Sequence, residues 1–241
     1  MKNMGKGRLF FWIIITASFL FTLYRNTAWV NSLVLWSDCL SKSPAKIRTH
    51  HLMGIAFMEK GMIDEAEAEF MTAISKINEQ EMPYRKADFL YFRIGQIYIR
   101  RGLYEKAEAA FKTALTYNSI NPVVRNHLGM LYLQKELPDK AENELRIALI
   151  QEPGYAYTHN NFAIIDMGKG LFDKAIEGFK GALLYAPDDP FIHNNLGVAY
   201  REKGLLNEAE KEFLKALSIK EDYQDAIDNL NMLKMSKGLK E

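Results

Sequence analysis

Residues 190–223 read PFIHNNLGVAYREKGLLNEAEKEFLKALSIKEDY, and this stretch decides the fold of the chain. Apolar residues recur three and four apart on each side of a glycine, which predicts two short amphipathic helices joined by a tight turn. Small residues stand where the two helices would cross, and one large residue fills the gap beside them. The residues that define the pattern are Leu196, Gly197, Tyr200, Gly204, Ala209, Phe213 and Ala216.

The pattern recurs at intervals of 34 residues, except for a first interval of 41. It produces four columns of equivalent residues: a small column, a first alanine column, a bulky column and a second alanine column. In that order the columns are Gly54, Gly95, Gly129, Ala163 and Gly197; Ala66, Ala107, Ala141, Ala175 and Ala209; Phe70, Phe111, Leu145, Phe179 and Phe213; Ala73, Ala114, Ala148, Ala182 and Ala216. A period of this size predicts stacked helix pairs, each of which buries its apolar face against its neighbours.

The columns and the turn glycine together resemble the tetratricopeptide repeat family. The resemblance implies an all-α fold, a right-handed superhelical solenoid of antiparallel helix pairs. Two residues depart from the family pattern, since Asp166 stands where the other repeats carry an aromatic residue and Glu136 replaces a turn glycine. Five complete repeats are expected, at residues 47–80, 88–121, 122–155, 156–189 and 190–223.

The columns continue beyond the complete repeats at both ends of the chain. One period before the first repeat, Trp36 stands in the bulky column and Cys39 in the second alanine column. Residues 27–46 are therefore expected to hold a partial repeat, with its second helix only. Residues 224–241 are expected to form a capping helix and tail, because Asn231 places a polar group where a further repeat needs glycine.

The 16 residues from Leu9 to Tyr24 carry no charge. This length lies between the apolar region of a signal peptide and a full membrane span. We expect a transmembrane helix that is retained, with residues 1–26 forming a cytoplasmic stub and the anchor, since no small-residue cleavage site follows. Positive charges ahead of the segment predict a cytoplasmic N-terminus and a repeat array on the periplasmic or other non-cytoplasmic side. A cleaved signal peptide, which would leave a periplasmic assembly factor, is the alternative.

Composition excludes several classes of function. Of the 241 residues, 48% are hydrophobic and 25% charged, as in an ordinary globular chain. The net charge of +1 provides no basic face, so no nucleic-acid partner is expected. The single cysteine, Cys39, excludes an internal disulfide framework and offers no ligand pair for zinc. Phosphate loops, nucleophile elbows and His-Glu-x-x-His pairs are absent from the sequence, so we expect neither an enzyme nor a bound cofactor or metal.

The first helix of each repeat is expected to be apolar on two sides. One side carries the small column, and the other carries apolar and amide side chains three and four residues apart. In the family that the chain resembles, this second side lines the concave inner surface, which implies a groove for a peptide or a partner protein. The predicted groove residues are Phe92, Gln96, Ile99, Asn126, Met130, Leu133, Tyr157, Asn160, Asn161, Ile164, Met167, Asn194 and Asn195.

Asparagine recurs on the predicted groove with the period of the repeat. One row is Asn126, Asn160 and Asn194, and a second row is Asn161, Asn195 and Asn229. An amide both donates to and accepts from a peptide backbone, so such rows suit an extended bound chain. They resemble the asparagine ladder in the repeat domain of the O-linked N-acetylglucosamine transferase. The alternative is that asparagine is simply a common residue at this place in the family.

The carboxylate clamp of chaperone-associated family members is not expected in this chain. That clamp needs a set of Lys and Arg side chains on the inner surface. This chain instead carries His51, Ile55, Phe92, Gln96, Asn126 and Met130 there. A terminal Glu-Glu-Val-Asp peptide is therefore not an expected ligand.

The leading hypothesis is a single-pass membrane protein whose repeat array docks another protein without catalysis. Met58, Met130 and Met167 would supply adaptable apolar contacts. An alternative is a truncated relative or detached tail of a multi-pass, glycosyltransferase-like membrane protein, in which the catalytic aspartates lie in the multi-pass part. The residues that resemble the junction of such proteins are Arg25, Asn26, Trp29, Leu35, Trp36, Asp38, Lys42, Ser43, Pro44 and Arg48.

Overall fold

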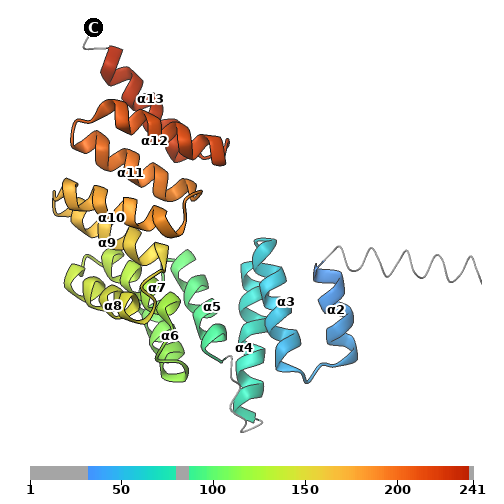
Figure 1. Ribbon diagram of the computed structural model, residues 1–241. Coiled ribbons are helices and arrows are strands. Elements are labelled where there is room, and N and C mark those ends of the chain that lie inside the picture. Colours follow the sequence, from blue (N-terminus) through green and yellow to red (C-terminus); the bar gives the residue numbers. More distant parts are fainter. Residues whose placement is uncertain (1–31, 80–86, 239–241) are drawn as a thin grey trace, which may run out of the picture. The chain divides into compact units, whose positions relative to one another are not determined.

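The computed structural model describes residues 32–79 and 87–238, which contain twelve helices and no strand (Figure 1). No helix in this part of the chain combines the length and the apolar character needed to cross a membrane. The predicted membrane segment at residues 9–24 and the last three residues of the expected tail lie outside the described residues.

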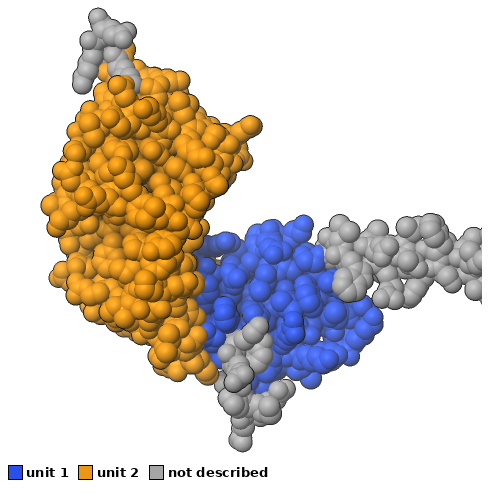
Figure 2. Space-filling model, viewed as in Figure 1, with its two compact units in different colours: residues 1–100 blue, residues 101–241 orange. Residues whose placement is uncertain are grey.

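The chain divides into two compact units, residues 1–100 and residues 101–241 (Figure 2). The expected repeat at residues 88–121 is divided between them, so its two helices belong to different units. Each unit is described by itself below.

The described residues of unit 1 form four helices, which Figure 1 labels. They are α2 (Ser32–Lys42), α3 (Ile47–Glu59), α4 (Ile63–Glu79) and α5 (Ala87–Arg100). Helices α3 and α4 form the helix pair expected for the first complete repeat. Helix α2 packs against α3, and α4 packs against α5. The expected second helix of the partial repeat is α2, and residues 27–31 of that prediction lie outside the described residues.

The described residues of unit 2 form eight helices, which Figure 1 shows in one stack. They are α6 (Tyr104–Tyr117), α7 (Pro122–Gln134), α8 (Pro138–Gln151), α9 (Ala156–Gly168), α10 (Phe172–Tyr185), α11 (Pro190–Glu202), α12 (Leu206–Ile219) and α13 (Gln224–Gly238). The first helices of the repeats are α7, α9 and α11, and the second helices are α8, α10 and α12. Helix α13 occupies the place of the expected capping helix.

The four columns form the core of the helix pairs. Every described alanine of the two alanine columns, and every residue of the bulky column, has 0% of its surface exposed. The residues of the small column have to be small because the facing helix comes very close to them. A Cβ atom at Gly54 would lie 2.5 Å from Cε1 of Phe70. In the fourth repeat the small residue is Ala163, and Gly178 on the facing helix leaves room for its Cβ. Large residues of one helix thus need small residues on the other.

The turn inside each helix pair takes the left-handed backbone conformation. Four of these turns use glycine, namely Gly61, Gly102, Gly170 and Gly204, with φ between +68° and +83°. In the third repeat Glu136 takes the same conformation, with φ of +57°. A residue with a Cβ atom is strained there, so the departure noted in the sequence adds a local cost but leaves the helix pair intact.

The first helices of unit 2 form a continuous layer. Helix α7 contacts α9, α9 contacts α11, and α11 contacts α13. Consecutive second helices make fewer contacts with one another than consecutive first helices do. The first helices therefore form the more tightly packed layer of unit 2.

Candidate functional site

Large apolar side chains are exposed on the first helices of unit 2. Met130, Tyr157, Phe191 and Met232 have 48%, 44%, 48% and 59% of their surface exposed. We call these four side chains the inner apolar surface. Met130 and Met232 occupy equivalent positions in their helices, three periods apart. The two repeats between them carry Ile164 and Val198 at the equivalent position, and both side chains are half-buried. The predicted groove residues Leu133 and Met167 are also half-buried.

Tyr157 and Phe191 are one period apart, in the first turns of α9 and α11. The hydroxyl of Tyr157 donates a hydrogen bond to Asp189 at 2.9 Å, and this bond raises the pKa of Tyr157. Phe191 meets Tyr223 edge to face, with ring centroids 4.9 Å apart. Lys220 lies 5.4 Å and 5.5 Å from the centroids of these two rings. Burial, together with Asp225, raises the pKa of Tyr223 to about 12, so this phenol stays neutral at physiological pH. The aromatic side chains therefore carry polar partners at one edge of the inner apolar surface.

The predicted asparagine rows are largely buried and hydrogen bonded to one another. Asn126 and Asn161 are each 2% exposed, Asn194 is 5% exposed and Asn160 is 8% exposed. Asn161 donates to Oδ1 of Asn126 at 2.8 Å, Asn160 donates to Oδ1 of Asn161 at 3.2 Å, and Asn195 donates to Oδ1 of Asn160 at 3.0 Å. These amides therefore connect the helices α7, α9 and α11.

A second group of amides continues this arrangement to α13. Asn229 donates to Oδ1 of Asn194 at 3.0 Å, and the guanidinium of Arg201 donates to Oδ1 of Asn229 at 2.9 Å. A buried amide needs hydrogen-bond partners, and these amides find them within the protein. Contact of the asparagine rows with a ligand stays a prediction.

Unit 1 holds the remaining predicted groove residues on α5. Phe92 is 7% exposed, whereas Gln96 and Ile99 are half-buried. Arg93 donates to Oε1 of Gln96 at 2.9 Å. The pKa of Arg93 is lowered, mainly by burial. An arginine side chain nevertheless stays charged at neutral pH. The most exposed large apolar side chain of this helix is Phe89, which is 45% exposed.

Glu108 is the centre of a charged cluster that joins α6 to α7. Lys112 and Lys135 each donate to its carboxylate at 2.7 Å, and the hydroxyl of Tyr132 donates at 3.0 Å. The two lysines, with Lys112 as the larger cause, lower the pKa of Glu108 to about 2. The three donors all bind the carboxylate of Glu108, and no side chain of the cluster is left as a free nucleophile. The cluster therefore links the two helices structurally. Among the described residues no three His, Cys, Asp or Glu side chains are grouped as metal ligands would be.

The tetratricopeptide repeat family model matches residues 90–121 and 192–223. Both matched stretches are therefore similar to tetratricopeptide repeats. The match at residues 192–223 lies within the stretch that defines the 34-residue pattern. The match at residues 90–121 covers the corresponding residues three periods earlier. A search of curated proteins finds no match.

Solved structures of tetratricopeptide repeat proteins resemble this chain. One chain of the APC/C hetero-tetramer Cut9-Hcn1 superposes with a TM-score of 0.71 at 20% identity, over 82% of this chain and 38% of that one. TTC0263, a thermophilic protein of Thermus thermophilus, superposes with a TM-score of 0.66 at 20% identity, over 79% of this chain and 100% of that one. YrrB, described as a TPR protein with an unusual peptide-binding site, gives a TM-score of 0.51 at 19% identity, over 80% and 96%. Identities this low show the fold alone, and they confirm the expected all-α repeat fold.

One contact that recurs among the repeats was not anticipated from the sequence. His193 lies between the carboxylate of Glu212, 2.6 Å from its Nδ1, and the carbonyl oxygen of Pro187, 3.0 Å from its Nε2. His50 lies in the same way between Glu69 and Pro44, at 2.7 Å and 2.9 Å. In the third repeat Arg125 replaces histidine, and it donates to Glu144 at 2.7 Å and to the carbonyl of Ser119 at 3.1 Å. The shared signal is a glutamate 19 residues after a His or Arg.

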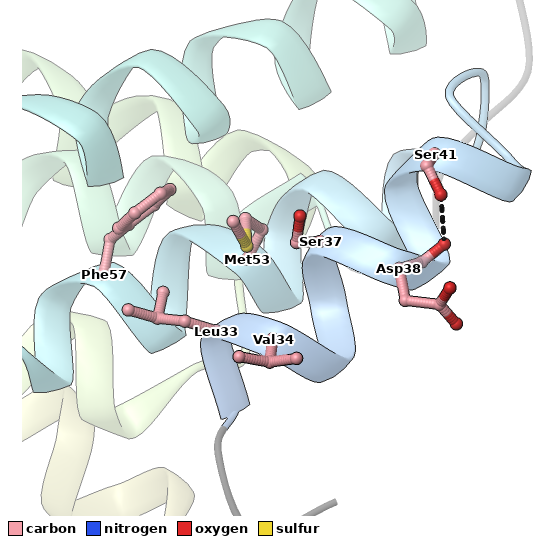
Figure 3. Close-up of a pocket in the computed structure, with 7 residues that line it drawn as sticks. All are labelled: Leu33, Val34, Ser37, Asp38, Ser41, Met53 and Phe57. Carbon is pink, nitrogen blue, oxygen red and sulfur yellow. Dashed lines mark hydrogen bonds between the residues drawn. The ribbon is translucent and has the colours of Figure 1, made fainter. Parts of the chain in front are cut away.

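Two open hollows flank α2 in the partial repeat. One, of about 460 Å³, is lined by Leu33, Val34, Ser37, Asp38, Ser41, Met53 and Phe57 (Figure 3). Its only charged side chain is acidic, and Lys42 forms an ion pair with it. The other hollow, of about 340 Å³, is lined by Trp36, Cys39, Lys42, Ser43, Lys46, Arg48, Thr49 and Leu52. The two hollows therefore differ in the sign of the charge at their edges.

Proposed function

We propose that the chain is a non-catalytic docking protein whose inner apolar surface binds an apolar segment of another protein. The observation that carries the proposal is the exposure of four large apolar side chains on adjacent first helices, from Met130 on α7 to Met232 on α13. Exposed large apolar side chains on neighbouring helices are typical of a binding surface, because in contact with water alone they lose the free energy of burial.

The character of the four side chains indicates how a partner would be held. Met130 and Met232 have flexible, polarisable side chains that adapt to the shape of a partner. Tyr157 and Phe191 present rigid rings at low entropic cost, and Asp189 and Lys220 lie beside them. A partner segment with apolar side chains and a few polar groups fits this surface.

The buried asparagines support the surface by holding its helices at fixed distances. The bond from Asn195 to Asn160 joins α11 to α9, and the bond from Asn161 to Asn126 joins α9 to α7. A surface held in this way loses little freedom when a partner binds, which favours affinity. The peptide-binding site named for YrrB supports a peptide as the class of partner.

We also propose that the segment from Leu9 to Tyr24 holds the chain in a membrane, with the repeats on the non-cytoplasmic side. Its 16 uncharged residues and the basic residues before it support this proposal. Anchoring would raise the effective concentration of the docking surface near a membrane partner. Alkaline extraction of membranes tests the anchor: an anchored chain stays in the membrane pellet, whereas a chain with a cleaved signal peptide is released.

Photo-crosslinking in the full chain tests the docking surface. A photoreactive amino acid at Met130 and, separately, at Met232 should capture the same partner protein, identified by mass spectrometry. Leu184, which is 81% exposed on the second helix α10, provides a control position with an equally apolar side chain. Capture of the same protein from Leu184 with equal yield would contradict a specific role for the inner apolar surface.

Binding should depend on the apolar character of the same side chains. In the chain that carries the photoreactive residue at Met232, replacing Met130→Asp should reduce capture at least tenfold, because a carboxylate would be desolvated under the partner. Leu184→Asp in the same background is the matched control and should leave capture unchanged.

A further inference from the structure

Helix α2 has an apolar face that the described helices cover only in part, with α3 packed beside it. None of its residues is buried. Trp36 and Cys39 stand in the bulky column and the second alanine column, but both are only half-buried. The equivalent Phe70 and Ala73 of α4 are 0% exposed, because α3 covers them. The first helix that would cover Trp36 is missing from the partial repeat as described.

The chain's own preceding residues do not suit this position. A first helix placed one period before α3 would bring Leu20 opposite Trp36. The equivalent residues of the other repeats are glycine or alanine, since even a Cβ atom at Gly54 would lie 2.5 Å from Phe70. A leucine opposite an indole would therefore overlap with it. The sequence therefore places no small residue at the position from which Gly54 faces Phe70.

The charges around this face are basic. The stretch from Ser32 to Arg48 contains one acidic residue, Asp38, and three basic residues. Asp38 is paired with Lys42, whereas Lys46 and Arg48 are exposed and form no ion pair with any residue that the structure describes. All three basic side chains line the hollow of about 340 Å³ that also contains Trp36. An apolar hollow surrounded by cations matches the surface of an anionic bilayer, which has phosphate groups above acyl chains.

The position of α2 in the sequence brings it close to the proposed membrane segment. Seven residues separate Tyr24 from Ser32. Even fully extended, these eight steps reach only about 28 Å. Tryptophan favours the boundary between headgroups and acyl chains, and Lys and Arg favour anionic headgroups. These preferences agree with the residues that surround the hollow.

We propose that α2 rests on the anionic surface of the membrane, with Trp36 in the interface and Lys46 and Arg48 against lipid phosphate groups. This inference rests on the proposed membrane attachment and requires anionic lipid in the leaflet that faces the repeats. It goes beyond attachment because it assigns a second, lipid-selective contact to the repeat array itself. The hollow of Figure 3 is not part of this contact, since its charged side chain is acidic.

The native cysteine gives a direct test, because Cys39 lines the basic hollow and is the only cysteine of the chain. The full chain is labelled at Cys39 with a nitroxide and reconstituted into phosphatidylcholine vesicles, with or without phosphatidylglycerol. Collision rates with oxygen, which concentrates in lipid, and with a water-soluble nickel chelate are measured by electron paramagnetic resonance. The ratio of oxygen to nickel collisions should rise at least threefold when phosphatidylglycerol is present.

Two matched variants separate lipid contact from other effects. Lys46→Glu with Arg48→Glu should abolish the rise in the collision ratio. Lys174→Glu with Lys211→Glu changes the net charge equally at exposed positions of α10 and α12 and should leave the rise intact. A label at Asn231→Cys in a Cys39→Ser chain gives the value for a fully hydrated site on α13.

The contrary outcomes differ from one another. A label that stays as hydrated as the one at position 231 overturns the contact of α2 with lipid, while alkaline resistance of the same vesicles shows that the attachment stands. A label shielded from both reagents, with or without phosphatidylglycerol, indicates that a protein helix covers α2, from this chain or a second copy, and also overturns the proposal. Release of the chain from the vesicles in alkali removes the attachment on which the proposal rests.

Discussion

Asn195 donates a side-chain hydrogen bond to Asn160 at 3.0 Å, although the two residues are 35 positions apart and belong to successive first helices. The same offset of 35 separates Asn161 from Asn126 and Asn229 from Asn194. The offset of 35 is one residue more than the 34-residue period, so the donor and the acceptor lie in successive repeats. Each bond therefore joins one repeat to the previous one. Side chains that the period places in rows thus become the links between repeats.

Replacing Asn160→Ala should destabilise unit 2. Asn160 accepts from Asn195 and donates to Asn161, so the change removes two hydrogen bonds and leaves buried groups without partners. We expect the free energy of unfolding to fall by about 1–3 kcal/mol. Urea denaturation of the full chain in mild detergent, followed by circular dichroism, measures it. Asn231→Ala, on the exposed side of α13, is the control and should change stability by less than about 0.5 kcal/mol.

The same substitution at two glycines should have opposite effects. Gly197→Ala places a Cβ atom 2.6 Å from the fully buried ring of Phe213, so it should lower stability by about 1–3 kcal/mol. At Gly181, inside α10, an added Cβ meets no atom within 4 Å. Gly181→Ala should therefore raise stability by about 0.5–1 kcal/mol through helix propensity. Thermal denaturation of both variants checks the signs, and a loss of stability at Gly181 would contradict the packing described here.

Glu136→Gly should stabilise the third repeat. Glu136 has φ of +57°, a conformation that costs a residue with a side chain about 1–2 kcal/mol. Glycine relieves this strain but loses more freedom on folding, so the net gain should be about 0.5–1 kcal/mol. The reverse change, Gly204→Ala, should destabilise, since Gly204 has φ of +83° and the added Cβ touches nothing else. Equal stability of both variants and the native chain in urea would rule out this account of the turns.

The link through Glu108 should weaken in acid. Its pKa of about 2 in the folded chain lies below the value of about 4.3 expected for an unfolded glutamate. The stabilisation is therefore fully present above about pH 4.3 and is lost as the pH falls from there towards 2. Glu108→Gln should lower the urea midpoint at pH 7 and have a much smaller effect near pH 2. Glu221→Gln, at an exposed position after α12, is the control, and a cost of Glu108→Gln that does not change with pH would contradict the ionic link.

The helix pairs could be predicted because each column residue has a partner at a fixed spacing. Gly197 has to be small where Phe213 is large, and Gly204 has to turn the chain between them. The capping helix was expected because Asn231 places a polar group where a further repeat needs glycine, and Leu230 and Leu233 of this helix are buried. These features depend on neighbours within about one period, which a repeated sequence makes visible.

The candidate surface could be predicted only in part. The period identifies equivalent positions but not their exposure, which depends on rotamers and on the distance between helices. It therefore placed Met130 and Asn126 in one groove, although Met130 is 48% exposed and Asn126 only 2%. The cluster around Glu108 was missed because its partners Tyr132 and Lys135 lie 24 and 27 residues away, which is neither a helical spacing nor a period.

The amide links have a direction, since each donor points back to an acceptor in the preceding repeat. A duplicated copy of one whole repeat would bring its own donor and its own acceptor, and both neighbours would find their usual partners. An inserted segment of any other length would leave unmatched amides on each side of the insertion. Duplication of a whole repeat would therefore lengthen such an array and leave the existing amide links in place.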